Sequence, residues 1–191
     1  MPEKRKTEES MTKIEERAHR IEEIVRRYGG PVPDNGTDKD EYYMRAALEL
    51  AETAAEYGDV PVGCVIVRDG EIVAAECNGR EVFHDALYHA ETAAISAACR
   101  KLGGWRLTRC TLYVTLEPCP MCAGAIWCAR VPRVVAGAKD AKAGAAGSVI
   151  NVNAYPLNHK FEMKFGVLEK ECRAVLTEFF QKRRKNKEST V

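Results

Sequence analysis

The stretch CTLYVTLEPCPMCAGA, residues 110–125, joins an apolar run to a pair of cysteines. Residues 110–117 are almost entirely apolar or β-branched, which is typical of a strand buried on both faces of a sheet. Beyond this run, Cys119 and Cys122 follow at C-x-x-C spacing, about one helical turn apart. Such a pair serves redox exchange, a structural zinc site or a catalytic metal centre, and the pair by itself does not distinguish among them.

Helical and strand patterns alternate on both sides of this stretch. The predicted elements are, in order, a helix over 41–57, strands over 60–67 and 71–77, a helix over 89–102, the strand over 110–117, a helix over 119–130, a strand over 133–138 and a helix over 168–184. The Asp69-Gly70 turn between the first two strands is a strong hairpin signal. This order predicts an α/β fold, a three-layer α/β/α sandwich with a mixed central sheet.

An N-terminal helical extension precedes this pattern. Apolar residues recur at helical spacing over about 11–28, which predicts an amphipathic helix. The segment GGPVPDNGTDKD, residues 29–40, is typical of a flexible, turn-rich linker. The expected organisation is therefore an extension over 1–40 and one domain over 41–187. We expect the extension to dock on its own domain or on a neighbouring chain rather than to take part in catalysis.

The composition narrows the class of protein. The chain has 191 residues, 46% of them hydrophobic, which is enough for one globular domain with a core. The net charge is +1, from 29 basic and 28 acidic residues, so any binding of nucleic acid must come from local patches. No apolar run approaches the roughly 20 residues of a membrane span, and the N-terminus lacks the apolar core of a signal peptide. We therefore expect a cytoplasmic protein with no membrane partner, whose eight cysteines are mostly reduced core residues.

The run HAE opens the helix predicted before the buried strand, with His89 first and Glu91 third. Side chains at positions i and i+2 of a helix point about 200° apart, so these two converge only on something beyond the helix N-terminus. Cys119 and Cys122 begin the next predicted helix in the same way. Two helix N-termini that face one point would present His89, Cys119 and Cys122 as three ligands and leave Glu91 unligated.

This set favours a catalytic metal centre over the two alternatives. A structural zinc site needs four protein ligands, and none of the other six cysteines forms a second C-x-x-C pair. A thioredoxin-like redox pair would need a βαβ arrangement that the chain lacks before the pair. Two thiolates neutralise Zn²⁺, the helix dipoles favour anionic sulfur, and the fourth position stays open for water, whose pKa zinc lowers to about 7. With Glu91 as the proton carrier, this is the chemistry of hydrolytic deamination.

At HAE and PCPMC the sequence resembles the zinc-dependent nucleoside and nucleobase deaminases, which share an H-x-E…P-C-x-x-C signature. The wider sequence, over roughly 41–185, is similar to the tRNA-specific adenosine deaminases. The stretches that carry this similarity are VPVGCVIV (60–67), TLYVTLEPCPMCAGA (111–125), GAKDAKAGAAGS (137–148) and EFFQKRR (178–184). The third discriminates best, because free-base deaminases generally differ there.

The resemblance implies a cytidine deaminase-like fold and an activity. It implies a homodimer that converts adenosine to inosine at wobble position 34 of a tRNA anticodon, in a tRNA expected to be an arginine isoacceptor. It implies one Zn²⁺ per subunit, held by His89, Cys119 and Cys122, with Glu91 as the proton shuttle. It also implies that the backbone N–H of Glu117 or of its neighbours helps to position the catalytic water.

The resemblance further implies two groups of substrate contacts. The first group would surround the flipped nucleoside, and consists of Val62, Asn78, Ala90 and Asp140. The second group would hold the flanking anticodon nucleotides, and consists of Phe179, Phe180, Arg183 and Arg184. Aromatic side chains beside cations suit unstacked RNA bases, although a basic helix end also complements its own dipole.

Two departures from the family pattern stand close to the signature. In HDALYHAE, Tyr88 occupies part of the place where the family often carries a Pro-Thr dipeptide, and Thr92 takes a position that is usually aliphatic. Two other interpretations of the chain stay open. One is a deaminase of a free base or nucleoside, such as guanine, cytosine or cytidine, with the same zinc site. The other is a non-enzymatic RNA-binding or zinc-stabilised module, which would have no use for Glu91.

Overall fold

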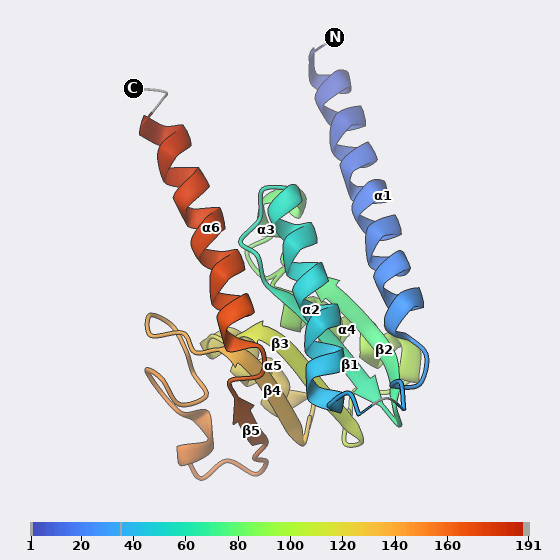
Figure 1. The fold of residues 1–191 in the computed structure, drawn as a ribbon, viewed down its shortest axis with the longest axis vertical. Coiled ribbons are helices and arrows are strands. Elements are labelled where there is room, and N and C mark those ends of the chain that lie inside the picture. Colours follow the sequence, from blue (N-terminus) through green and yellow to red (C-terminus); the bar gives the residue numbers. More distant parts are fainter. Residues whose placement is uncertain (1, 35, 189–191) are drawn as a thin grey trace.

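The computed structural model describes residues 2–34 and 36–188, with side chains described over 11–34 and 36–186. Met1 and Asn35, which belong to the predicted extension, lie outside the described residues, as do residues 189–191. One five-stranded sheet with strand order β2-β1-β3-β4-β5 organises the fold (Figure 1). The strands are β1 Gly63–Arg68, β2 Glu71–Cys77, β3 Cys110–Leu116, β4 Arg133–Ala138 and β5 Glu162–Phe165.

The sheet is mixed, as the sequence predicted. β1 pairs antiparallel with both β2 and β3, whereas β4 pairs parallel with both β3 and β5. The β1–β2 hairpin closes through a two-residue turn, in which Asp69 and Gly70 have φ angles of 54° and 88°. Positive φ at both central residues is the requirement of a type I′ turn, which Asp-Gly satisfies. The hairpin prediction is therefore confirmed.

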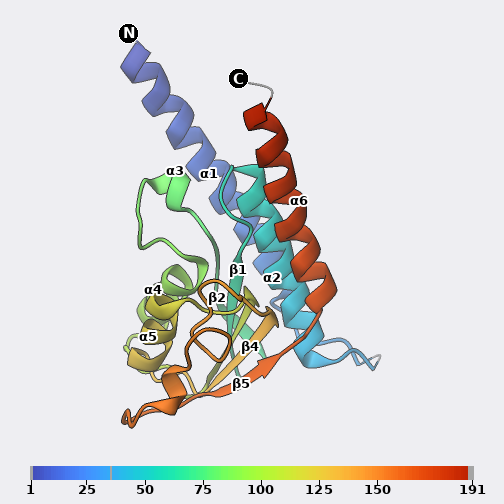
Figure 2. The same ribbon diagram turned by 90° about the vertical axis from the view of Figure 1, so that its left-hand side faces the viewer.

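Helices cover both faces of the sheet and complete the predicted three-layer sandwich (Figures 1 and 2). The helices are α1 Pro2–Tyr28, α2 Lys39–Glu56, α3 Arg80–Phe83, α4 Ala90–Leu102, α5 Pro120–Cys128 and α6 Glu169–Glu188, with a short 3-10 helix, η1 Val152–Ala154. Side chains alternate along each strand: Val65 and Tyr113 face α1, α2 and α6, whereas Ile66 and Leu112 face α4 and α5. Both faces of β1 and β3 are consequently buried.

Asp40 ties the helical layer that contains α2 to three strands of the sheet. Asp40, in the first turn of α2, accepts hydrogen bonds from Arg133 on β4 (2.8 and 2.9 Å), from Lys164 on β5 (2.6 Å) and from the Tyr113 hydroxyl on β3 (2.9 Å). The hydrogen bonds with Arg133 hold the pKa of Asp40 well below its usual range. The carboxylate is therefore charged at neutral pH, and its interactions are lost only in strong acid.

The fold differs from the sequence expectation at its ends and in its short elements. Helix α1 begins at Pro2 rather than near residue 11, because residues 3–9 are mainly Glu, Lys and Arg, which favour helix without producing an apolar period. Strand β5, α3 and η1 were not expected. β5 is an edge strand with no fully buried residue, so it lacks the apolar run that marks the central strands.

No helix of the described chain has the length and apolarity that a bilayer crossing requires.

Candidate active site

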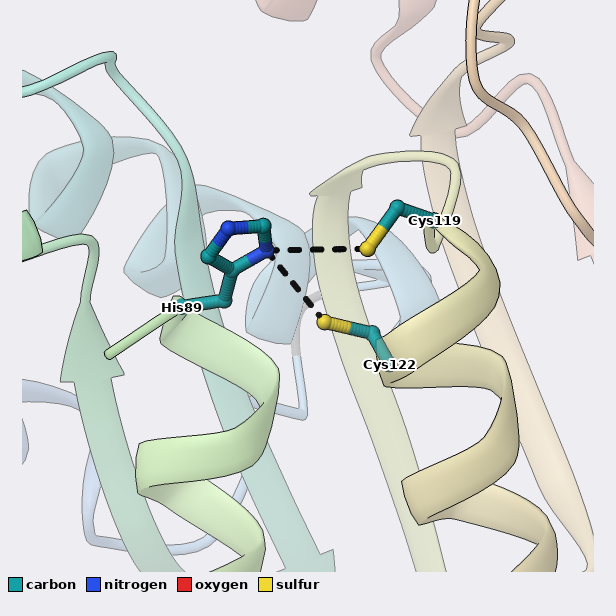
Figure 3. A group of neighbouring side chains, drawn as sticks. All are labelled: His89, Cys119 and Cys122. Carbon is teal, nitrogen blue, oxygen red and sulfur yellow. Dashed lines mark hydrogen bonds between the residues drawn. The ribbon is translucent and has the colours of Figure 1, made fainter. Parts of the chain in front are cut away.

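Three metal-binding side chains meet at the N-termini of α4 and α5 (Figure 3). His89 is the N-cap of α4, Cys119 is the N-cap of α5, and Cys122 lies one turn into α5. The Nδ1 atom of His89 lies 3.6 Å from Cys119 Sγ and 3.5 Å from Cys122 Sγ. His89 precedes the two cysteines by 30 and 33 residues in the chain, yet the structure brings together all three residues that the sequence singled out as ligands.

The spacing and chemistry of this cluster fit zinc. In a tetrahedral site with Zn–S near 2.3 Å and Zn–N near 2.0 Å, a sulfur and a nitrogen ligand stand about 3.5 Å apart, which is close to both observed separations. The three ligand atoms all lie within 4.8 Å of one another. Sulfur and imidazole ligands suit zinc, whereas magnesium and calcium prefer oxygen. His89, Cys119 and Cys122 would therefore hold Zn²⁺ and leave the fourth tetrahedral position to a ligand from outside this cluster.

The electrostatics of the cluster favour anionic sulfur. Hydrogen bonds from the Cys122 thiol and from His89 lower the pKa of Cys119 to about 4. The same partnership with Cys119 raises the pKa of Cys122. Both sulfurs also lie at the positive end of the α5 dipole. A bound divalent cation would stabilise both sulfurs as thiolates.

Glu91 is a buried carboxyl group close in the chain to the metal ligand His89. It lies in the first turn of α4, two residues after His89, and its side chain is only 4% exposed. Burial raises the pKa of Glu91 to about 7, and the nearby Cys119 thiolate adds to the effect. A carboxyl group with a pKa near neutrality can accept and release a proton at physiological pH. Glu91 thus has the properties that the sequence interpretation requires of a proton shuttle.

A cavity of about 180 Å³ lies against the metal cluster and Glu91. Its walls include all four residues that the resemblance assigned to the nucleoside: Val62, Asn78, Ala90 and Asp140. The Asn78 side chain is buried, and its amide nitrogen donates to the backbone oxygen of Val60 (3.2 Å). Its Oδ1 atom is buried and has no hydrogen-bond partner among the described residues. A buried acceptor on a cavity wall is costly when unpaired, so it is suited to a donor from a ligand.

Glu117 has a structural role that the resemblance did not imply. Its backbone N–H donates to Ala138 O (2.8 Å), so this group is not available to position a water. Its buried carboxylate accepts from the backbone N–H groups of Asp140 (3.0 Å), Ala146 (3.1 Å) and Ser148 (3.0 Å), and from the Ser148 hydroxyl. Burial alone would raise the pKa of Glu117, but these hydrogen bonds lower it. The carboxylate thereby folds the 140–148 loop, which carries Asp140 and Ala143 into the cavity wall.

Glu117→Gln is expected to loosen this loop. The amide keeps the shape of the side chain, but it removes the negative charge and replaces one acceptor oxygen by an NH2 group that faces backbone donors. We expect a loss of about 1–3 kcal/mol in the free energy of unfolding, measured in urea, and faster amide exchange over 140–148. The matched control is Glu162→Gln, on the exposed edge strand β5, which should change stability by about 0.5 kcal/mol or less. Unchanged exchange of the loop in Glu117→Gln would contradict this role.

The four residues assigned to flanking nucleotides lie apart from the metal cavity, on α6. Phe180, Arg183 and Arg184 line a separate hollow of about 550 Å³, together with Lys142. Phe179 is half-buried and contacts Phe180 edge to face. The 140–148 loop connects the metal cavity with this hollow, because Asp140 lines the cavity and Lys142 lines the hollow. The sequence pattern around EFFQKRR identified this surface, but it did not reveal the contribution of Lys142.

Comparisons with known proteins agree with this geometry. The family model of the cytidine and deoxycytidylate deaminase zinc-binding region matches residues 37–138. The tRNA-specific adenosine deaminase of Bacillus subtilis is 48% identical over 152 residues, which cover 79% of this chain and 94% of that protein. A solved structure from work on A-to-I editing by tRNA:A34 deaminases is 41% identical, with a TM-score of 0.69, and covers 71% of this chain and 99% of the other.

A solved guanine deaminase from Bacillus subtilis is more distant, at 33% identity and a TM-score of 0.50 over 62% of this chain and 86% of that one. The family model and the 48% identical relative each cover more than half of the chain. The chain therefore belongs to the zinc-binding cytidine and deoxycytidylate deaminase family and, within it, to the tRNA-specific adenosine deaminases.

Proposed function

We propose that this protein is a zinc-dependent hydrolase that converts adenosine to inosine at wobble position 34 of a tRNA anticodon. The observation that carries the proposal is the cavity that lies against the metal cluster and is lined by the buried Glu91 and by Asn78 with its unpaired acceptor. The cavity volume of about 180 Å³ suits one base rather than a larger ligand. The 48% identity to a tRNA-specific adenosine deaminase supports adenosine in tRNA as the source of that base.

The residues at the cavity have separate roles in hydrolysis. His89, Cys119 and Cys122 would hold zinc, which supplies a water molecule activated for attack on C6 of the base. As the C6–O bond forms, Glu91 would carry one proton of the attacking water to the adjacent ring nitrogen. It would then carry the second proton, from the C6 hydroxyl, to the amine as the C6–N bond breaks. Asn78 Oδ1 accepts a hydrogen bond from the nucleoside and fixes its orientation. Adenosine and water are consumed, and inosine and ammonia are produced.

The α6 surface would hold the RNA on either side of the flipped nucleotide. Phe180 is 43% exposed, which allows a base to stack on its ring, and such stacking contributes about 1–3 kcal/mol per base. Arg183, Arg184 and Lys142 place positive charge around the same hollow. Because the chain carries almost no net charge, we propose that this local patch supplies the phosphate contacts.

We propose that the protein acts in the cytoplasm as a homodimer, on an arginine tRNA. An exposed apolar segment after the 140–148 loop supports contact with a second chain, and its large apolar residues are Val149, Ile150, Tyr155 and Leu157. Light scattering on the purified protein tests the dimer. A competition among tRNA isoacceptors with adenosine at position 34 tests the choice of tRNA.

The test of the proposed activity compares RNA with free bases. Zinc-loaded protein is incubated with an anticodon stem-loop that carries adenosine 34, and separately with guanine, cytosine, cytidine and adenosine, and both inosine and ammonia are measured. We expect equal amounts of inosine and ammonia from the stem-loop. Ammonia from a free base, with the stem-loop unchanged, would replace the proposal with the free-base alternative. Binding of the stem-loop without any ammonia would favour the non-enzymatic module.

A variant of the α6 surface sharpens this test. The double variant Phe180→Ala with Arg183→Ala should bind the stem-loop more weakly and raise its KM, because a stacking platform and a cation are lost. Its zinc content should not change, since α6 contributes no residue to the metal cluster. A free-base deaminase would be indifferent to both substitutions. The same double variant therefore distinguishes the two activities in a single assay series.

A further inference from the structure

Helix α1 sends one charged side chain into the domain, next to the cavity. The family match begins at residue 37, so α1 lies outside it. Arg17 is only 3% exposed, and its Nη2 donates to the backbone oxygen of Cys77 (2.6 Å) and to Glu76 Oε2 (3.3 Å). These partners lie 59 and 60 residues further along the chain, at the end of β2. The extension therefore contacts the segment that leads directly into the active site.

The same guanidinium faces a pair of stacked aromatic rings. Phe83 and Tyr88 stack with their ring centroids 4.2 Å apart, and the central carbon of Arg17 lies 5.1 and 5.4 Å from the two centroids. Both rings also pack against Gly79, where a β-carbon would lie 2.7 Å from Phe83 and 2.9 Å from Tyr88. The Gly79 N–H donates to Tyr88 O (3.1 Å) and closes the segment into a loop. Arg17 thus contacts both the stack and the strand end from which the loop 79–88 starts.

Both ends of this loop adjoin residues of the cavity. Cys77 precedes Asn78, which carries the unpaired acceptor, and Tyr88 precedes the metal-binding His89. Other anchors lie near its two ends: Asp59 accepts from the backbone N–H groups of Glu81 and Val82, and the Thr92 hydroxyl donates to Leu87 O. The aromatic stack between them is in contact with Arg17. A shift of that stack would displace Asn78 and His89 relative to each other.

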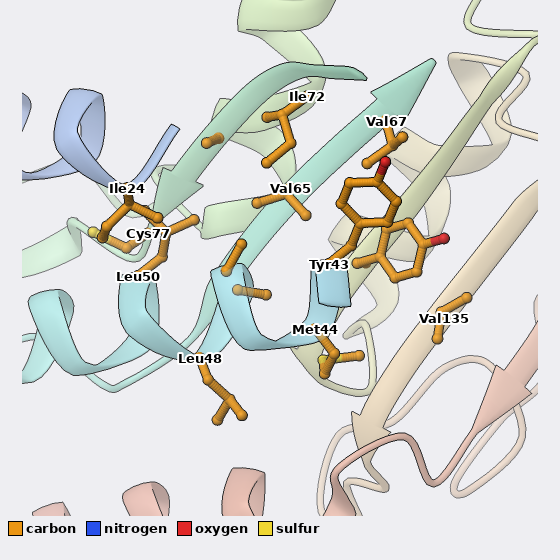
Figure 4. Packing of buried hydrophobic residues seen from close by; sticks show 14 of the residues in the cluster. Ile24, Tyr43, Met44, Leu48, Leu50, Val65, Val67, Ile72, Cys77 and Val135 are labelled. Carbon is orange, nitrogen blue, oxygen red and sulfur yellow. The ribbon is translucent and has the colours of Figure 1, made fainter. Parts of the chain in front are cut away.

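Contacts other than those of Arg17 also dock α1 on the domain. Ile24 is almost fully buried beside Leu50 and Cys77 (Figure 4), and Ile21 belongs to the same core cluster. Arg27 forms an ion pair with Glu49 (2.6 Å) at the lower end of the helix. A buried ion pair adds little net stability, because the desolvation of the cation offsets its hydrogen bonds, although removal of the cation alone leaves Glu76 and Cys77 O without their donor. The Arg17 guanidinium is therefore better explained by the loop 79–88 that it orients than by a gain in the stability of the protein.

We propose that Arg17 is a positioning residue of the active site, through which the N-terminal helix holds the loop 79–88 and sets the places of Asn78 and His89. Arg17 acts through Cys77 O and the Phe83–Tyr88 stack and does not itself touch the cavity. The extension is then part of the catalytic unit rather than an appendage. The inference rests on the proposed function only where activity is measured.

The test compares Arg17→Met with Arg27→Met. The two variants make the same change on the same helix, once at the buried contact and once at an exposed ion pair. Amide exchange over 79–88, bound zinc, the thermal midpoint, and kcat and KM for the adenosine-34 stem-loop are measured on full-length protein. Arg17→Met should speed exchange over 79–88 and lower kcat/KM by about 10- to 100-fold. Its zinc content should stay close to wild type, and its loss of kcat/KM should exceed that of Ile24→Ala at a similarly lowered thermal midpoint, because Glu76 and Cys77 O lose their donor. Arg27→Met should match wild type in every measurement.

Further variants separate positioning from folding. Arg17→Lys keeps the charge and one donor, so it should recover part of the loop protection and part of kcat/KM. Ile24→Ala loosens the helix as a whole and should lower the thermal midpoint. If Arg17→Met leaves loop exchange at the wild-type rate, or if its kcat falls only in proportion to a lowered thermal midpoint as in Ile24→Ala, the inference is overturned. Wild-type protein that leaves the stem-loop unchanged would instead reject the proposed function, and the exchange measurement would still decide the role of Arg17.

Discussion

Glu91→Gln is expected to keep its zinc and to lose activity by about 10²- to 10⁴-fold in kcat, the contribution of a positioned proton carrier. The carboxamide fills the same buried space at the start of α4, but it cannot take a proton from water or give one to the leaving amine. Single-turnover formation of inosine on the stem-loop measures the loss. Metal analysis on the same sample shows whether the cluster of His89, Cys119 and Cys122 is intact.

Glu52→Gln is the control for this experiment. Glu52 is an exposed residue of α2 whose pKa is also raised, by burial of part of its carboxyl group and by its acidic neighbours, but it lies away from the cavity. Its variant should turn over like wild type. If Glu91→Gln retained more than a tenth of wild-type kcat, Glu91 could not be the proton shuttle.

Cys122→Ser is expected to remove both the metal and the activity. Cys122 is fully buried against His89 and Cys119, and a serine hydroxyl is a poor zinc ligand at neutral pH. Zinc binds the folded state, so wild type should be stabilised by about 2.7 kcal/mol when free zinc is 100-fold above the dissociation constant. Cys122→Ser should lack this stabilisation by zinc. Bound zinc, inosine formation and thermal unfolding with and without a chelator measure the three effects.

Cys128→Ser gives a matched control at the other end of α5. Cys128 is exposed and lies outside the metal cluster, so this variant should keep its zinc, its activity and its response to chelator. A Cys122→Ser protein that still bound one zinc per chain and formed inosine would show that the cluster is not the catalytic metal site. Loss of zinc from Cys128→Ser would point to a metal site elsewhere on α5.

Local sequence patterns determined the central elements of the fold. The buried run at 110–117, the Asp69-Gly70 hairpin and the helices that start at HAE and PCPMC depend on periodicity, turn residues and caps within a few positions. These signals also placed His89, Glu91, Cys119 and Cys122, because their chemistry follows from residue type and from being at a helix N-terminus. Strand β5 and helix α3 escaped prediction, since each is short and its pairing partner or cap lies far away in the chain.

The sequence by itself thus determined the fold class, and it predicted as metal ligands the three residues that the structure brings together and as proton carrier the buried Glu91 beside the same cavity. Only the tertiary structure decided which buried polar groups have hydrogen-bond partners and which residues those partners are. Glu117 finds backbone donors 23 to 31 residues away, and Arg17 finds its acceptors 59 and 60 residues away. Asn78 shows the converse, a buried acceptor left without a partner on the cavity wall. The burial and pairing of a single polar side chain depend on what packs against it from distant segments, and no local periodicity in the sequence encodes that.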